Sequence, residues 1–139
     1  MADHSTYELA RFHQAQAGTY SQALGELKRG RKETHWMWFI FPQIAGLGHS
    51  AMSRKYAISG LDEARAYLAH PVLGPRLIEC TRLVGVSGRP IADIFGSPDD
   101  MKFRSSMTLF AKAQGEGVFS EAVEAMCGGV FDEATLAKL

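Results

Sequence analysis

The segment at residues 35–43, with the sequence HWMWFIFPQ, combines aromatic side chains that can stack on a flat group with polar side chains that can form hydrogen bonds. It contains both tryptophans of the chain, Trp36 and Trp38, and it begins at His35 and ends at Gln43. Aromatic walls with a few fixed polar groups are typical of small-molecule sites. Two interpretations remain open here: the segment lines a pocket, or it is a central core helix that the other helices surround.

Two further segments carry groups suited to an anionic ligand. In the first, residues 46–50, with the sequence GLGHS, would let backbone N–H groups approach a ligand, and Ser53, Arg54 and Tyr56 follow directly. Arginine can bind a phosphate or carboxylate through two parallel hydrogen bonds, and glycine-rich backbone can form an anion-binding concavity. An ordinary loop is the alternative interpretation of this stretch.

In the second, residues 102–108, with the sequence KFRSSMT, interleave two cations and three hydroxyls with apolar side chains. On a helix this spacing places Lys102 and Ser106 on one side and Arg104 on a neighbouring side. If the helix faces the aromatic segment, its polar edge completes an anion site. Alternatively the helix faces solvent, and Arg104 pairs with an acidic residue at 99 or 100. The candidate ligand-binding residues are His35, Trp36, Trp38, Gln43, Ser53, Arg54, Tyr56, Lys102, Arg104, Ser105 and Ser106.

The residue spacing selects no reaction, and it leaves open whether the chain is an enzyme. His35 or His49 could act as a base and a serine as a nucleophile, but no spacing pairs them. The acidic residues also form no favoured pair of the kind that glycosidases use. The five histidines are scattered, and the sequence lacks CxxC, HExxH and P-loop patterns, so we expect no metal site and no cofactor. Cys80 and Cys127 fall in helical patterns and are expected to be buried structural thiols.

The elements that position these residues are predicted to be helices. The chain of 139 residues has the size of one domain, and we expect a single domain over residues 1–139. Short apolar stripes at helical spacing are separated by glycine and proline, and no stretch of five residues alternates as a strand would. The sequence therefore predicts an all-α fold, a compact and irregular array of about six to eight short helices.

The ends of these helices are predicted from capping residues, prolines and glycines. Ser97 is expected to cap a helix that begins at Pro98, because a missing N–H costs nothing at the first helical position. Gly85 and Gly88 are expected to stop the helix that follows Pro71. The other predicted boundaries are capping boxes of Ser5 with Glu8 and of Ser59 with Asp62, a helix from about Tyr20 to Arg29, a helix that begins near Val118 and a short last helix that begins at Asp132.

The charges cancel over the whole chain but not along it. Fifteen Lys and Arg residues balance fifteen Asp and Glu residues, which argues against a polycation that coats nucleic acid and against a polybasic membrane anchor. Residues 28–104 nevertheless hold twelve basic and seven acidic residues, which leaves room for a local anion site. The chain starts without a signal-peptide pattern, and its longest apolar run is far shorter than the ~20 residues that cross a bilayer. We therefore expect a cytoplasmic protein with no membrane contact and no nucleic-acid partner.

The segment at residues 32–43 resembles the small bacterial proteins grouped as domain of unknown function 1810, some of which carry an inherited calpastatin label. This resemblance implies a compact, mainly helical domain and no established activity. The match continues through residues 46–48, 53, 56–58, 64, 67–68, 70–71, 73–74, 76–77, 94–96, 99, 102, 105–110 and 135–136.

The sequence is also similar, more weakly, to the NADAR domains, which are proposed to act on compounds derived from NAD or ADP-ribose. Lys102 and Phe103 correspond to a Lys-Phe pair in a late helix of those domains. Glu63 or Asp62 near Tyr67 corresponds to their early acidic residue beside an aromatic one. The sequence departs from the NADAR pattern because it lacks a clear Glu-His pair.

The predicted function is the binding of a small anionic molecule, nucleotide-like or ADP-ribose-like, at an aromatic and basic pocket, with or without catalysis. Trp36 or Trp38 would stack on the apolar part of this ligand, and Arg54 and Lys102 would balance its charge. The alternative is a non-enzymatic protein-interaction module, with an aromatic core that is purely structural or with Trp38 or Phe41 on its surface. The sequence leaves the oligomeric state open.

Overall fold

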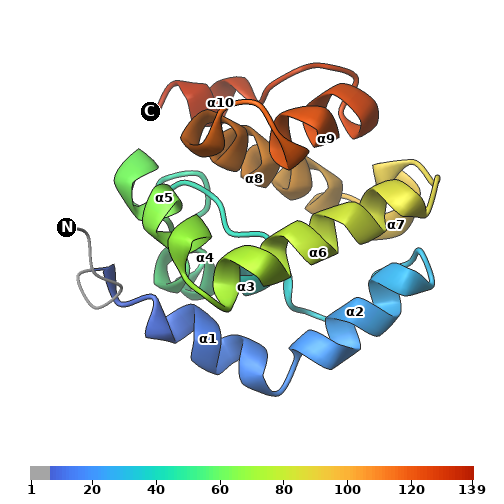
Figure 1. The fold of residues 1–139 in the computed structure, drawn as a ribbon, viewed down its shortest axis with the longest axis horizontal. Helices are drawn as coiled ribbons and strands as arrows, with labels where there is room; N and C mark the ends of the chain where they lie inside the picture. The colour runs from blue at the N-terminus through green and yellow to red at the C-terminus, as the bar shows by residue number, and fades with distance from the viewer. Residues whose placement is uncertain (1–6) are drawn as a thin grey trace.

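The computed structural model describes residues 7–139, which form ten α-helices and, among themselves, no β-strand (Figure 1). The all-α prediction is confirmed, whereas the predicted number of helices is too low. The helices at Ala51–Lys55 and Ile91–Phe95 were not predicted, because they have only five residues each, too few for a hydrophobic stripe to be recognised. The helices are α1 (Ala10–Ala17), α2 (Tyr20–Lys28), α3 (Met37–Ile40), α4 (Ala51–Lys55), α5 (Leu61–Ala69), α6 (Leu73–Val86), α7 (Ile91–Phe95), α8 (Asp99–Gln114), α9 (Val118–Met126) and α10 (Glu133–Leu136).

The longest helix, α8, organises the core. It packs against α5, α7, α9 and α10, and its side chains at Phe103, Met107 and Phe110 are fully buried. α6 packs on α2, α5 and α9, and α1 packs on α3. In Figure 1, α1 and α2 form the lower edge of the view and α9 and α10 the upper edge. Buried side chains from helices along the chain, from α1 to α9, form one hydrophobic cluster.

Several predicted boundaries agree with the structure. Helices begin at Tyr20 and Val118 as predicted. Asp132 caps α10, because its side chain accepts a hydrogen bond from the backbone N–H of Thr135. The predicted stop at Gly85 is wrong, since α6 continues through this residue. A single glycine lowers helix stability by only about 1 kcal/mol, and the packing of α6 outweighs that loss.

The start of α8 lies one residue later than predicted. Pro98 occupies the N-cap position, Asp99 is the first helical residue, and Ser97 forms no capping hydrogen bond. The acidic residues at 99 and 100 lie in the first turn, where they complement the positive end of the helix dipole. Ser5, which belongs to another predicted capping box, lies outside the described residues.

The predicted capping box at Ser59 is shifted. Helix α5 begins after Gly60, and Glu63, rather than Asp62, accepts the Ser59 N–H at 2.8 Å.

A tight corner joins α5 to α6. At the other end of α5, a Cβ on Gly74 would lie 2.1 Å from the backbone oxygen of Leu68. Only glycine fits at that point, and the close approach of the two backbones lets α6 pack on α5.

Candidate functional site

The aromatic segment divides into a buried part and an exposed edge. Trp36 precedes α3, and its side chain is fully buried. Phe41 is also fully buried, with its ring 5.2 Å from that of Phe103, so the expectation that it lies on an interaction surface is wrong. Trp38 alone among residues 36–41 is half-buried. Trp36 therefore belongs to the core, and Trp38 is the tryptophan that a ligand can reach.

A buried carboxylate holds Trp36 in place. Glu26 on α2 is 1% exposed, and its Oε1 accepts the indole N–H of Trp36 at 3.0 Å. The backbone N–H groups of Glu33 and Thr34 donate to the same oxygen at 2.6 and 2.9 Å, and the Thr34 hydroxyl donates to Oε2 at 2.6 Å. Glu26 forms no ion pair within the described residues. Hydrogen-bond donors thus take the place of a positive partner.

These donors keep Glu26 ionised in spite of its burial. Burial alone would raise the pKa of the carboxyl, but the hydrogen bonds from Thr34, Glu33 and Trp36 outweigh it and lower the pKa from 4.5 to about 2. The charged side chain therefore fastens residues 33–36 to α2 at neutral pH. Nothing in the local sequence indicates this role, because an isolated carboxylate on a helix normally faces solvent.

Asp99, at the start of α8, lies between two lysines. Lys32 Nζ is 2.9 Å from its Oδ2, and Lys102 Nζ is 3.4 Å from its Oδ1. Lys32 lies over the ring of Trp36 and Lys102 over the ring of Trp38, at 5.1 and 5.4 Å from the ring centroids. Because one negative charge serves two positive charges, the cluster keeps an excess positive charge. Lys102 is its more accessible end, with a side chain that is 27% exposed against 8% for Lys32.

A groove of about 210 Å³ opens beside Lys102, and we call it the Lys102 groove. One wall comes from α4 and the loop that precedes it, and the other comes from α8 and the start of α10. An isolated parallel bridge between Ile44 and Ile58 holds the loop. A Cβ on Gly48 would lie 2.5 Å from the Ser53 hydroxyl oxygen, so the loop can approach α4 this closely only at a glycine. The polar residues that line the groove are Gln43, Ser53, Lys102, Ser105 and Asp132.

A smaller recess adjoins the Lys102 groove next to Trp38. It shares four lining residues with the groove, Gln43, Leu47, Gly48 and Ser53. Its other lining residues are Trp38, Ile44, Gly46 and Tyr56. Its volume is only about 10 Å³, which is room for about one water molecule. Of these two spaces, only the Lys102 groove has room for a ligand larger than a water molecule, and Trp38 lies beside it.

The predicted binding residues separate into two groups. Those that line the groove or the recess are Trp38, Gln43, Ser53, Tyr56, Lys102 and Ser105. Of the others, Trp36 and Ser106 are fully buried, whereas His35 and Arg54 are exposed but line neither space. Arg104 donates to a backbone oxygen at the end of α9 at 3.4 Å, and it forms no ion pair with the acidic residues at 99 and 100.

The hydroxyls of α8 attach α10 to the core. Ser105 donates to Asp132 Oδ2 at 3.0 Å, and the Thr108 hydroxyl oxygen accepts the backbone N–H of Asp132 at 2.9 Å. Thr135 donates to the same Oδ2 through its N–H and its hydroxyl. The sequence predicted Asp132 as a helix cap but not as a wall of the groove, because nothing in the local pattern shows that α10 lies against α8.

Replacing Asp132 with alanine is expected to lower the free energy of unfolding by about 1–2 kcal/mol, because the cap of α10 and an acceptor for Ser105 are lost together. Since α10 has only four residues, its amide protons should exchange much faster with solvent, as measured by native-state hydrogen exchange. Glu133→Ala, at the exposed next position, is the control and should change stability by less than about 0.5 kcal/mol. Unchanged exchange in the Asp132 variant would show that α10 does not depend on this anchor.

The cysteines take no part in the groove. Cys80 and Cys127 are buried, as predicted. Burial raises the pKa of the Cys80 thiol to about 12 and also raises the pKa of Cys127, so both are neutral thiols near pH 7.

Within residues 7–139 no group of three or more His, Cys, Asp and Glu side chains is placed to hold a metal ion. The same residues include no helix with the length and apolarity to cross a bilayer.

Similarity to known proteins extends over almost the whole chain. The family model described as "Protein of unknown function (DUF1810)" matches residues 6–139. The chain belongs to the DUF1810 family. A solved structure, that of the conserved hypothetical protein Rv1873 from Mycobacterium tuberculosis, is 51% identical to this DUF1810 chain, with a TM-score of 0.93. The similarity covers 96% of this chain and 97% of that one, whereas no curated protein matches.

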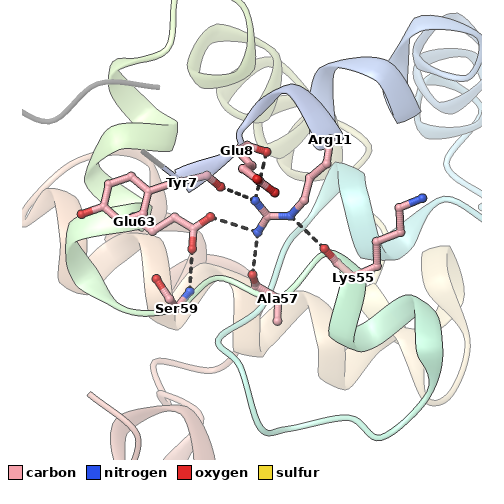
Figure 2. A network of polar contacts seen from close by, with 7 residues as sticks. All are labelled: Tyr7, Glu8, Arg11, Lys55, Ala57, Ser59 and Glu63. Atoms are coloured by element: carbon pink, nitrogen blue, oxygen red, sulfur yellow. Dashed lines mark hydrogen bonds and ion pairs between the residues drawn. The ribbon is translucent and has the colours of Figure 1, made fainter. Parts of the chain in front are cut away.

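Outside the groove, the DUF1810 chain contains an ion pair that sequence analysis missed, between the partly buried Arg11 and the buried Glu63 (Figure 2). Arg11 Nη2–H donates to Glu63 Oε2 at 2.9 Å, and the Glu63 side chain is 4% exposed. All five N–H groups of the guanidinium have acceptors, so none is left for a ligand. The network joins α1 to the end of α4 and the start of α5, which makes it structural. The other four acceptors are the backbone oxygens of Tyr7, Glu8, Lys55 and Ala57.

Proposed function

We propose that this DUF1810 protein binds a small anionic molecule in the Lys102 groove. The observation that carries the proposal is the position of Lys102, whose ammonium group lies over the Trp38 ring at a groove of about 210 Å³. Asp99 is closer to Lys32 than to Lys102 and has a single charge to share between them. Lys102 therefore retains positive charge that can attract an anionic group.

The other polar groups of the groove indicate what this ligand carries besides its charge. The side-chain amide of Gln43 forms no hydrogen bond with any residue from 7 to 139, and it can both donate and accept. Asp132 uses Oδ2 for three hydrogen bonds, which leaves Oδ1 to accept from a ligand hydroxyl. An anion that also carries hydroxyl groups fits this set, as in a sugar phosphate or a nucleotide-like molecule.

The size of the groove favours the smaller members of this class. Ligand sites usually measure ~300–1,000 Å³, so an open groove of about 210 Å³ has room for a phosphate and its sugar but for only part of ADP-ribose. We propose binding without a specific reaction. The Ser53 hydroxyl is hydrogen-bonded to Ser50 at 2.9 Å, and no histidine lies among the described residues that line the groove, so no serine–histidine pair supports a reaction there.

Calorimetric titration with inorganic phosphate, ribose 5-phosphate, AMP and ADP-ribose tests the proposal. At least one of the hydroxyl-bearing anions should bind and stabilise the fold, by about 2.7 kcal/mol at a concentration of 100 times Kd. Lys102→Met should weaken this binding at least about 10-fold, because the charged contact is lost while an apolar stem remains over Trp38.

The matched control is Arg54→Met, which removes the same charge from an exposed residue that does not line the groove. The affinity of the Arg54→Met variant for the bound anion should equal that of the unmodified protein. Equal losses in the Lys102 and Arg54 variants would show that only the overall charge matters, and the proposal would then be wrong. It would also be wrong if none of the four compounds bound.

A further inference from the structure

The outer face of α6 is an apolar surface without a partner in the described chain. The inner face of α6 is buried through Leu77, Cys80 and Val84. The outer face forms a shallow open groove, and α6 crosses the middle of the view between α2 and α9 (Figure 1). Val86 is 82% exposed, more than any other large apolar side chain in residues 7–139. The residues that line this face are Pro75, Ile78, Glu79, Arg82, Leu83 and Val86.

Two charged residues lie in the middle of this apolar face. Arg82 is exposed and forms no hydrogen bond or ion pair with any residue from 7 to 139. Glu79 accepts a hydrogen bond from the Tyr20 hydroxyl through Oε1 at 2.5 Å, and its Oε2 is available. The face therefore offers one unpaired cation and one partly used carboxylate, three residues apart on the helix.

The order of these residues makes the face complementary to itself. Pro75, Glu79, Arg82 and Val86 follow one another at steps of four, three and four residues, so they form one stripe along the helix. The stripe is symmetric about the midpoint between residues 80 and 81. If a second α6 packs antiparallel across this midpoint, Glu79 faces Arg82 of the second copy, and Pro75 faces Val86 of the second copy. A two-fold axis repeats both contacts.

We propose that two copies of this chain associate through antiparallel packing of their α6 helices. Self-complementary charge favours a second copy over an unrelated partner, because both charges of the stripe then meet an opposite charge and the apolar ends cover each other. The stripe spans twelve residues, about 18 Å of helix. An interface of one such helix from each copy lies below the ~1,200 Å² of stable complexes, so the dimer forms only at high protein concentration.

Sedimentation equilibrium from about 10 µM to about 1 mM protein tests this dimer, the range in which weak interfaces associate. The unmodified protein should shift from monomer to dimer over this range. Arg82→Glu places two carboxylates opposite each other and should weaken association at least about 10-fold. Glu79→Arg places two cations opposite each other and should have the same effect.

The two variants are expected to restore association when they are mixed. A copy with Arg82→Glu and a copy with Glu79→Arg present opposite charges at both contacts, so the mixture should form a heterodimer while each variant alone stays monomeric. Arg31→Glu makes the same charge change at another exposed position and should dimerise as the unmodified protein does. Circular dichroism should show all three variants folded.

Three outcomes would overturn the proposal. The first is a monomer throughout the concentration range for the unmodified protein. The second is association of the unmodified protein that Arg82→Glu leaves unchanged, which would place the interface on another surface. The third concerns the mixed variants. A mixture of the two variants that stays monomeric would exclude the antiparallel arrangement.

Discussion

Replacing Glu26 with alanine is expected to lower the free energy of unfolding by about 4 kcal/mol. The substitution leaves the indole N–H of Trp36 and the hydrogen-bond donors of Thr34 and Glu33 without their acceptor, and each unsatisfied buried group costs about 1–3 kcal/mol. Glu26→Gln keeps the shape but turns an amide NH₂ towards N–H and O–H donors, so about half of this loss is expected. Urea unfolding, monitored by circular dichroism, measures the free energy of unfolding of both variants.

Glu33→Ala is the control for this experiment. Its side chain is 56% exposed, and its backbone N–H, which donates to Glu26, is retained in the variant. The change should stay within about 0.5 kcal/mol. A Glu26→Ala protein as stable as the Glu33→Ala protein would mean that the carboxylate does not hold the core in the way described.

The Glu26 carboxylate also makes the stability of the protein depend on pH. Its pKa of about 2 in the folded protein lies below the ordinary value of 4.5, so the ionised form favours folding. This contribution is fully present above pH 4.5, and it is lost as the pH falls towards 2. Between pH 4.5 and pH 2, the free energy of unfolding of the unmodified protein should therefore fall by up to about 3 kcal/mol more than that of the Glu26→Ala variant.

Replacing Arg11 with alanine is expected to lower the free energy of unfolding by about 3–5 kcal/mol, because the change leaves the buried Glu63 carboxylate without its positive partner. It also removes the five guanidinium hydrogen bonds that join α1 to the end of α4 and the start of α5, while the Ser59 N–H still donates to Glu63 (Figure 2). Arg11→Lys should recover only a small part of the loss, since an ammonium group cannot reach five acceptors in one plane. Thermal and urea unfolding provide the measurement.

A double-mutant cycle with Glu63→Ala separates the ion pair from the rest of the network. The coupling energy between the two positions should be about 2 kcal/mol, because they lie in direct contact. Arg65→Ala tests an exposed pair on the same helix, Arg65 with Asp62 at 3.6 Å, and should cost less than about 1 kcal/mol. Additive losses at Arg11 and Glu63 would contradict the proposed partnership.

The predictions from sequence were accurate where the signal is local. The apolar stripe of α6, with Leu73, Leu77 and Val84, repeats over enough turns to define both the helix and its buried face. The N-cap at Asp132 is equally local, since the side chain and the N–H it binds are three residues apart. The all-α class follows from such patterns, because each contact they depend on lies within one helix.

The features that sequence reasoning missed depend on contacts between distant residues. Glu63 lies 52 residues from Arg11, so neither residue type shows that they are partners. Glu26 is close to Trp36 in sequence, but its burial depends on how the 33–36 segment folds back on α2. Helices α4 and α7 were missed for a different reason, because five residues cannot display a period of 3.6.

The candidate site was predicted in part for the same reasons. Spacing alone indicates that Trp36 and Trp38 face different directions, but it does not show that Trp36 is the one that lies in the core and binds the buried Glu26. The hydroxyls on α8 were predicted to be part of an anion site, whereas Ser105 and Thr108 bind Asp132, a residue from the end of the chain. A pattern within one helix cannot reveal a partner on another.

The contrast between the two tryptophans has an optical consequence. Trp36 is fully buried with its N–H on a carboxylate, whereas Trp38 is half-buried beneath the ammonium of Lys102. Indole emission depends on polarity and on nearby charges, so the two rings differ in what they report. The fluorescence of Trp36 reports whether the core is folded, and the fluorescence of Trp38 reports binding in the Lys102 groove. The protein thus carries an intrinsic fluorophore at each place, and no external dye is needed to follow either one.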